Sequence, residues 1–370
     1  MTDLWNNEPG FPLRALNQIT IPGTHDAGCY IDRGWYGNFQ SRTQTETVAQ
    51  QLAGGIRYFD LRPRATNGQF WTYHSPVNFI TVYYGDRLDG PAGILNQVAA
   101  FMNNLLPGDR ELVILNISHF GGFNNVQHGG MIGAITAALG NHLVQDTQAN
   151  LDLFNATYTA LLTDPITGNV ASRVAILYDG ALDTDRELYI QNALAGLGGI
   201  PALPAGFFVL SPKYVPPANP IFLFDQYAGT GNLTTMRANQ FAKLTNRVAY
   251  PYSTRAWALG AGNWPANAAG GVAGTLHLYS WTLTPQPLSD PLTAAQDTSN
   301  PALLDALSGR NPGCAWAGPI YDPAADPKIN VLYVDDYSSE IHDTPGSAWD
   351  QLALPVAIAA RLNMGPLTTW

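Results

Sequence analysis

The sequence predicts an α/β fold that consists of one distorted (βα)8-type TIM barrel. Along all 370 residues, short runs rich in β-branched and aromatic residues alternate with longer segments in which apolar residues recur at helical spacing. Runs such as LVILNI and RVAILY are apolar almost throughout, as is typical of parallel strands covered on both faces. About eight such runs without a polar linker between them favour a closed barrel in a single domain, residues 1–370.

Each predicted element rests on this periodicity. The runs expected to form strands are Gln18–Ile21, Ile56–Leu61, Phe70–Tyr73, Leu112–Ile117, Arg173–Tyr178, Phe207–Leu210, Leu276–Leu283 and Asn330–Val334. The segments expected to form helices are Thr43–Ala53, Ile94–Leu105, Gly129–Leu143, Ala149–Leu162, Thr184–Leu194, Thr234–Val248 and Ala348–Leu362. Residues 211–227 and 250–274, rich in Pro, Gly and aromatic residues, are expected to be long loops at the rim.

Charge and composition exclude several classes of function. The 18 basic and 28 acidic residues give a formal net charge of −10, and no run of Lys or Arg exceeds a residue or two. The chain therefore lacks the basic surface that binds nucleic acid or anionic lipid by charge. Cys29 and Cys314 have no metal-ligand spacing, so they are expected to be unpaired or structural, with one disulfide possible.

Targeting signals are also missing from the printed sequence. No stretch reaches the ~18 apolar residues of a membrane span, and the first residues lack a basic region followed by an apolar core. Two alternatives follow: a protein that stays inside the cell, or a mature secreted form. The scarcity of Lys and the abundance of Gly, Asn and Thr favour the secreted, mature, extracellular form.

Four of the predicted strands end in residues that can transfer protons or bind phosphate. In parallel barrels, catalytic groups gather at the carboxyl ends of the strands. The residues found there are His25 and Asp26 in PGTHD, Asp60 and Arg62 in YFDLR, His74 in YHS, and Asp335 and Asp336 in YVDDY. Two imidazoles can act as base and acid while a guanidinium meets the charge on phosphate, so this set suits phosphoryl transfer. The period of two places Asp60 and Arg62 on one face of their strand.

These motifs resemble a known family. PGTHDAG, then QTETVAQQLAGGIRYFDLRPR, then YHS about fifty residues after the first histidine are similar to the X region of phosphatidylinositol-specific phospholipase C, in its bacterial-type branch. The resemblance implies cleavage of phosphatidylinositol to diacylglycerol and inositol 1,2-cyclic phosphate, which is slowly opened to inositol 1-phosphate. It implies that His25 is the general base, that His74 is the general acid assisted by Asp26, and that Arg62 stabilises the phosphorus centre.

The resemblance also implies supporting roles. Asp60 is expected to support the acid side, and Asp336 is expected to orient His25, with Asp335 as the alternative one residue away. Ser118 and Asp179 stand where bacterial relatives have basic residues, and they are expected with Tyr214 to bind the headgroup.

No cofactor is expected, because Arg62 takes the place that calcium has in the eukaryotic branch. Calcium remains a lesser alternative, since Asp26, Asp60 and Asp179 offer oxygen ligands. The charge of Arg62 would repel such an ion at short range.

The expected partner is a phospholipid at a membrane interface, bound by a monomer. Trp35, Tyr36 and Phe39 follow the His25 segment and are expected to contact the membrane as amphipathic rings at the rim. His119 at a strand end fits equally a substrate contact and a hydrogen-bonded structural residue.

Two other functions remain open. The first is a related barrel phosphodiesterase that acts on another phospholipid or a glycerophosphodiester, for which a metal requirement would be diagnostic. The second is a non-catalytic lipid- or sugar-binding barrel, which would bind liposomes without releasing product.

Overall fold

The computed structural model describes residues 1–34, 41–74, 83–179, 202–210, 221–245, 275–284, 290–308, 321, 326–340 and 351–364. Its main sheet has eight strands in the order β8-β7-β6-β2-β1-β11-β10-β9, and each neighbouring pair is parallel. A bridge between Leu210 and Ile221 joins the two outer strands and nearly closes the barrel. The strands are β1 (Ile21–Thr24), β2 (Tyr58–Leu61), β6 (Leu112–Ile117), β7 (Arg173–Asp179), β8 (Phe207–Leu210), β9 (Phe222–Phe224), β10 (Thr275–Trp281) and β11 (Val331–Val334).

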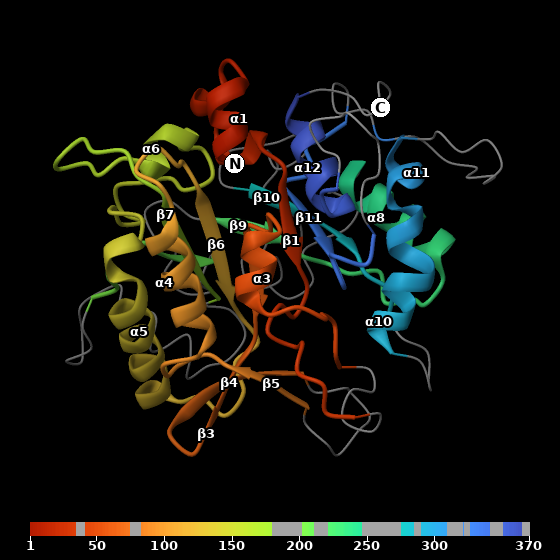
Figure 1. Ribbon diagram of the computed structural model, residues 1–370, viewed down its shortest axis with the longest axis horizontal. Coiled ribbons are helices and arrows are strands. Elements are labelled where there is room, and N and C mark those ends of the chain that lie inside the picture. The colour runs from red at the N-terminus through yellow and green to blue at the C-terminus, as the bar shows by residue number, and fades with distance from the viewer. Residues whose placement is uncertain are drawn as a thin grey trace, which may run out of the picture.

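A second, antiparallel sheet lies beyond the carboxyl ends of the barrel strands, at the bottom of Figure 1. It consists of β3 (Pro63–Thr66), β4 (Gln69–His74) and β5 (Tyr83–Arg87). The predicted strand Phe70–Tyr73 therefore exists but belongs to this sheet and not to the barrel. The barrel's remaining strand is β9, which falls within 211–227, where the sequence predicts only a loop.

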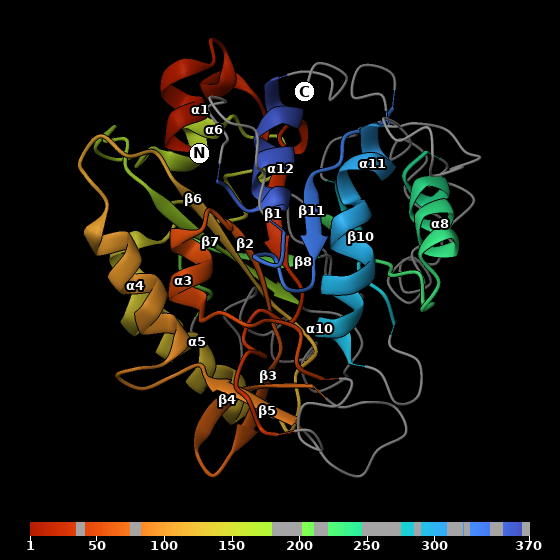
Figure 2. The same cartoon turned by 45° about the vertical axis from the view of Figure 1, so that its right-hand side comes forward.

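Helices cover the outside of the barrel. The α-helices are α1 (Thr2–Asn7), α3 (Val48–Ala53), α4 (Ile94–Asn104), α5 (Asn125–Leu139), α6 (Tyr158–Leu162), α8 (Leu233–Thr245), α10 (Pro291–Ala294), α11 (Leu303–Ser308) and α12 (Leu354–Met364). Short 3-10 turns span Phe11–Leu13, Leu16–Gln18, Gly140–His142 and Asn300–Ala302, and a π-helical turn spans Ala295–Ser299. Figure 2 shows α3, α4 and α5 on one side of the barrel and α10, α11 and α8 on the other. The predicted helix Thr184–Leu194 lies outside the described residues.

Local capping explains why two helices begin later than periodicity predicts. The Thr47 hydroxyl accepts a hydrogen bond from the Gln50 amide at 3.2 Å, and the Gln50 side chain accepts one from the Thr47 amide at 3.0 Å. This reciprocal cap starts α3 at Val48 rather than at Thr43. Thr157, which also has an extended backbone, caps α6: its hydroxyl accepts a hydrogen bond from the Ala160 amide at 3.2 Å. That helix therefore begins at Tyr158.

Alternation along the strands divides the core into two layers. Residues that point outward, such as Phe59, Val113 and Ile176, pack against the helices. Residues that point inward, such as Tyr58 and Ile114, fill the amino-terminal half of the barrel, which α1, α6 and the turns near them close at the top of Figure 1. At the carboxyl ends of β2, β6 and β11 the inward positions are polar, namely Asp60, Asn116 and Asp335.

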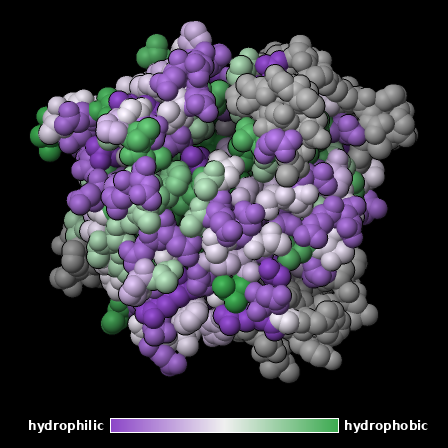
Figure 3. Space-filling view, in the orientation of Figure 1, coloured by the Kyte–Doolittle hydropathy of each residue, from purple (hydrophilic) through white to green (hydrophobic). Residues whose placement is uncertain are grey.

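The surface shows apolar residues in small groups. On the face shown in Figure 3, these groups are separated by hydrophilic side chains. The exposed large apolar residues of the described ranges are Leu13, Leu106, Val126, Ile166, Tyr227 and Met364, which come from different elements. In those ranges, every helix is too short or too polar to span a membrane.

Candidate active site

His25 and Asp335 form the first contact of the site. Thr24 and Val334 are in register on the neighbouring strands β1 and β11, and the His25 amide donates to the Val334 carbonyl at 3.0 Å. The residues that follow this pair therefore meet, and His25 Nδ1 lies 2.7 Å from Asp335 Oδ1. An ionised Asp335 fixes the proton on Nδ1 and leaves Nε2 facing the site.

The prediction that Asp336 orients His25 is corrected by this geometry. The Asp336 carboxylate accepts hydrogen bonds from the Thr45 hydroxyl and, at 2.6 Å, from Gln296 Nε2. The period of two explains the difference, because Asp335 continues the inward face of β11 and Asp336 points away from it. Asp336 also has a φ of +40°, where the chain turns out of the strand.

Asp26 lies at the centre of the site. Its Oδ2 is 3.5 Å from His25 Nε2 and 3.7 Å from His74 Nε2, and its Oδ1 is 2.7 Å from Arg62 Nε. The side chain has no solvent exposure, whereas the two imidazoles and the guanidinium are 20–22% exposed. The geometry therefore brings both predicted histidines and the predicted arginine around one buried carboxylate, with their outer edges open to solvent.

Asp60 holds the other side of Arg62. Its Oδ2 is 3.0 Å from Arg62 Nη2 and 3.1 Å from Arg62 Nε, so the expectation that both side chains share one face of their strand is confirmed. The same oxygen accepts a hydrogen bond from the Tyr333 hydroxyl at 2.6 Å, and Oδ1 accepts one from the Ser118 hydroxyl at 3.2 Å. Asp60 has no direct contact with His74 among the described residues. It is linked to His74, the predicted acid, through Arg62 and Asp26.

His74 comes from β4 of the small sheet. Its backbone pairs with Tyr83 of β5, and this hairpin brings the imidazole over the carboxyl end of the barrel. Its Nδ1 is buried and has no hydrogen-bond partner among the described residues. The sequence correctly predicts that His74 joins the site, but a different sheet from the expected one delivers it.

Burial and neighbouring charges separate the two imidazoles. Burial lowers the pKa of His25, but the carboxylates of Asp26 and Asp335 outweigh it and leave the pKa above its ordinary value. Burial, together with the positive charge of Arg62, lowers the pKa of His74 to about 3. At neutral pH His25 is therefore the stronger base and His74 is neutral in the unliganded site.

The two central carboxylates differ in the same way. Burial raises the pKa of Asp26 despite the nearby Arg62. Burial acts in the same direction on Asp60, but the charge of Arg62, followed by the charges of His119 and His25 and the Tyr333 hydrogen bond, outweighs it and lowers the pKa of Asp60. Asp60 is therefore firmly ionised, and Asp26 is the carboxylate that more readily takes a proton.

The headgroup and membrane predictions have different outcomes. The Ser118 hydroxyl is buried and contacts Asp60 and, at 2.8 Å, His119 Nδ1, so its role toward substrate stays a prediction. The Asp179 backbone ends β7 and pairs with Leu210, while its side chain lies outside the description. Also outside the described residues are Tyr214, Trp35, Tyr36, Phe39 and Cys314. Cys29 is buried and free of a disulfide within the described ranges.

The sequence did not lead to a prediction for Tyr333, and it did not decide between a substrate contact and a structural role for His119. Tyr333 and Asp335 alternate along YVDD, so the period of two would have predicted that both point inward beside His25. His119 is exposed just beyond β6 with a φ of +53°, and its carbonyl accepts a hydrogen bond from the Tyr73 hydroxyl at 2.8 Å.

A cation would compete with Arg62 for this site. Among the described residues, His25, Asp26 and Asp60 offer ligand atoms within 4.8 Å of one another. The guanidinium already contacts both carboxylates, so the positive charge that an ion would supply is in place. These oxygens therefore fit a hard cation only if Arg62 moves away.

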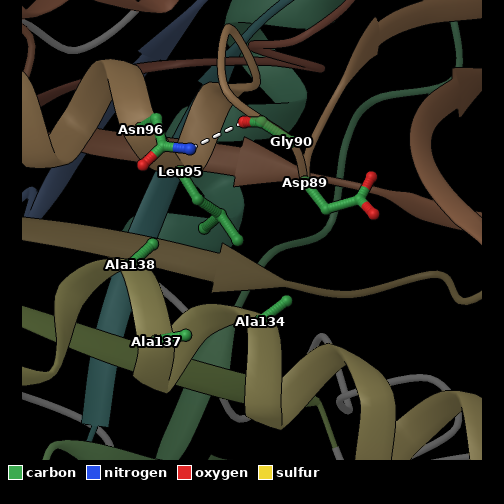
Figure 4. Close-up of a pocket in the computed structure, with 7 residues that line it drawn as sticks. All are labelled: Asp89, Gly90, Leu95, Asn96, Ala134, Ala137 and Ala138. Atoms are coloured by element: carbon green, nitrogen blue, oxygen red, sulfur yellow. Dashed lines mark hydrogen bonds between the residues drawn. The ribbon is translucent and has the colours of Figure 1, made fainter.

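A separate pocket lies between α4 and α5 (Figure 4). It is lined by Leu95 and three alanines together with Asp89, Gly90 and Asn96, whose side chain donates to the Gly90 carbonyl at 2.6 Å. Asp89 is paired with Arg87 at 2.8 Å. The pocket offers no unpaired charged group and no link to the residues around Asp26.

The fold and the site define a parallel barrel with titratable groups gathered at the carboxyl ends of its strands, which is where parallel barrels carry their active sites. Comparison with known sequences and solved structures confirms the similarity to phosphatidylinositol-specific phospholipase C. No family model matches the chain. The chain is 29% identical over 171 residues to PI-PLC X domain-containing protein 3 of Danio rerio, which covers 39% of this chain and 48% of that protein. It is 30% identical over 74 residues to 1-phosphatidylinositol phosphodiesterase of Staphylococcus aureus strain Newman. That match covers 20% of this chain and 24% of the Staphylococcus aureus protein. The matches thus span about half or less of these relatives.

Solved structures extend the similarity to nearly the whole chain. Phosphatidylinositol-specific phospholipase C from Listeria monocytogenes has a TM-score of 0.55 at 16% identity and covers 97% of this chain and 98% of that one. A pentafluoro-Phe form of the Staphylococcus aureus enzyme has a TM-score of 0.54 at 12% identity and covers 94% of each chain. At these identities the likeness establishes the TIM-barrel fold.

Proposed function

We propose that the chain is a phosphodiester-cleaving lyase that converts phosphatidylinositol to diacylglycerol and inositol 1,2-cyclic phosphate. The observation that carries this proposal is the placement of His25 Nε2 and His74 Nε2 at 3.5 and 3.7 Å from one Asp26 oxygen, with Arg62 beside it. A base and an acid that lie around one carboxylate, with a cation beside it to bind phosphate, can act on opposite sides of a phosphorus atom. The curated relatives support this substrate class by their names.

His25 is the general base. Its Nδ1 donates to Asp335, so Nε2 takes the proton of the inositol 2-hydroxyl as that oxygen attacks phosphorus. The two carboxylates near the ring stabilise the imidazolium that forms. This is the function of the raised pKa of His25, because a stronger base holds the proton once it has been transferred.

Arg62 binds the phosphate. Its guanidinium is held by Asp26 at 2.7 Å and by Asp60 at 3.0 Å, so the fork is oriented before substrate arrives. Charge that develops on the non-bridging oxygens in the transition state then meets an ordered cation.

His74 is the general acid for the leaving glycerol oxygen. In the unliganded site burial and the charge of Arg62 keep it neutral, with a pKa of about 3. A bound phosphodiester carries a negative charge that offsets Arg62, so substrate binding favours the protonated imidazole. Asp26 lies 3.7 Å from His74 Nε2 and assists this proton transfer. As the bond from phosphorus to the glycerol oxygen breaks, that oxygen takes the proton.

We also propose that no divalent cation is required, because Arg62 supplies the positive charge between Asp26 and Asp60. The chain is proposed to act as a monomer on phospholipid at a membrane interface, outside the cell. The near absence of lysine and the net charge of −10 support binding led by aromatic and apolar side chains rather than by basic ones.

The test follows phosphorus NMR signals from phosphatidylinositol vesicles, with phosphatidylcholine and glycerophosphoinositol as competing substrates. A cyclic phosphate signal from phosphatidylinositol alone, unchanged by EDTA, is expected. His25→Ala and His74→Ala should each remove more than 99% of turnover, on the order of the 10²–10⁴ that a positioned acid or base contributes. His142→Ala is the matched control, since this imidazole contacts Asn103 outside the site. Wild-type-like turnover in both active-site variants, or turnover that disappears with EDTA, contradicts the proposal.

A further inference from the structure

The two carboxylates that contact Arg62 have unequal surroundings. Asp60 accepts from the Tyr333 hydroxyl at 2.6 Å, from Arg62 at 3.0 and 3.1 Å, and from the Ser118 hydroxyl at 3.2 Å. Asp26 faces the guanidinium and the two imidazoles, and within the described residues neither of its oxygens has a hydrogen bond of regular geometry. Donors favour the charged form of a carboxylate, and burial without donors favours the neutral form.

Tyr333 provides the shortest of the Asp60 contacts and also touches the base. The residue lies on β11 in register with Gly23 of β1 and is 6% exposed. Its ring centroid is 5.3 Å from that of His25 at an interplanar angle of 55°, and it meets the Tyr58 ring edge-on at 6.3 Å. The ring position is therefore fixed by packing, which aims the hydroxyl at Asp60.

We propose that Tyr333 is a positioning residue: its hydroxyl bond holds the Asp60 carboxylate against Arg62, and so keeps the guanidinium oriented toward phosphate. The inference rests on the proposed function. When the hydroxyl is lost, Asp60 keeps its other donors but loses the shortest of them. The carboxylate can then rotate, and Arg62 loses one of the two anchors that orient its fork toward phosphate.

The experiment uses Tyr333→Phe, which keeps the ring and removes only the hydroxyl. The matched control is Tyr158→Phe, because the Tyr158 hydroxyl is bound to the Arg110 carbonyl at 2.9 Å in the core at the amino end of the barrel. Each variant loses one hydroxyl hydrogen bond of a buried tyrosine. We expect Tyr333→Phe to lower kcat at least tenfold with less than a threefold change in KM, and Tyr158→Phe to keep kcat within twofold of wild type.

A double-substitution cycle shows whether Tyr333 acts through Asp60. If it does, Tyr333→Phe should slow an Asp60→Asn background less than twofold, because the acceptor that it positions is already changed. A tenfold loss that persists in the Asp60→Asn background overturns the inference. So does a Tyr333→Phe variant whose kcat stays within twofold of wild type.

A readout without turnover separates this inference from the proposed function. The Arg62 Nε–H resonance, assigned by its loss in Arg62→Lys, should exchange with water faster in Tyr333→Phe than in wild type or Tyr158→Phe. Equal exchange rates in all three overturn the positioning role. If wild type yields no cyclic phosphate, the proposed function fails, and the exchange rates still decide the role of Tyr333.

Discussion

Replacing Asp335 with asparagine tests the central geometry of the site. The buried Asp335 carboxylate has an oxygen 2.7 Å from His25 Nδ1, and asparagine has nearly the same shape without the charge. The asparagine amide can also donate to Nδ1 and so force the imidazole proton onto Nε2, where the base is needed. Loss of the comparable carboxylate in a serine-protease triad costs about 10⁴ in kcat. We expect Asp335→Asn to lower kcat by about 10²–10⁴.

The pH dependence of kcat/KM gives a second, independent test of the contact between Asp335 and His25. His25 must be unprotonated to act as a base, and its raised pKa places the acidic limb of kcat/KM above the ordinary value of 6.5. Removing one opposite charge at this distance lowers a pKa by about 1–3 units. In Asp335→Asn, the residual activity should therefore persist to lower pH, with the limb shifted down by about one unit or more.

The neighbouring aspartate supplies the control for this prediction. Asp336→Asn removes a carboxylate that contacts Thr45 and Gln296, so it should cost about 1–3 kcal/mol of stability by thermal unfolding. Its pH limb should remain in place and its kcat within tenfold of wild type. If Asp336→Asn shifts the limb while Asp335→Asn does not, the reasoning from strand parity is refuted.

Three further predictions concern Arg62, a buried ion pair outside the site, and added calcium. Arg62→Lys keeps the positive charge but cannot bridge Asp26 and Asp60 with one planar guanidinium. The kcat measured on phosphatidylinositol vesicles should therefore fall at least about 100-fold, with little change in Tm. Activity near that of wild type would show that a point charge is enough. Arg57→Met removes the buried contact of Arg57 Nε with Glu111 Oε2 at 2.7 Å, but Glu111 keeps the Met1 amino group at 3.3 Å. The unfolding free energy in urea titrations should therefore fall by about 1–3 kcal/mol, and kcat of the folded fraction should not change. Added calcium should leave wild-type turnover unchanged. Stimulation by calcium that EDTA reverses would instead support the calcium-assisted reaction.

The prediction of the barrel succeeded where local periodicity carries the information. Leu112–Ile117 and Phe207–Leu210 have the predicted bounds, because a run that is apolar almost throughout is buried on both faces wherever its neighbours lie. Strand β9 was missed because Phe222–Phe224 is short and follows a proline-rich stretch, so its pairing with β10 is what makes it a strand.

The sequence by itself determined which chemistry is available: His25, Asp26, Asp60, Arg62 and His74 stand at strand ends, and the period of two puts Asp60 and Arg62 on one face. Only the tertiary structure decided which aspartate holds His25, that Tyr333 binds Asp60, and that a hairpin outside the barrel delivers His74. Those contacts join residues that are 310 positions apart for His25 and Asp335, 273 apart for Tyr333 and Asp60, and 48 apart for Asp26 and His74. Local propensity fixes which face a side chain occupies, but the register between distant strands fixes which side chains meet.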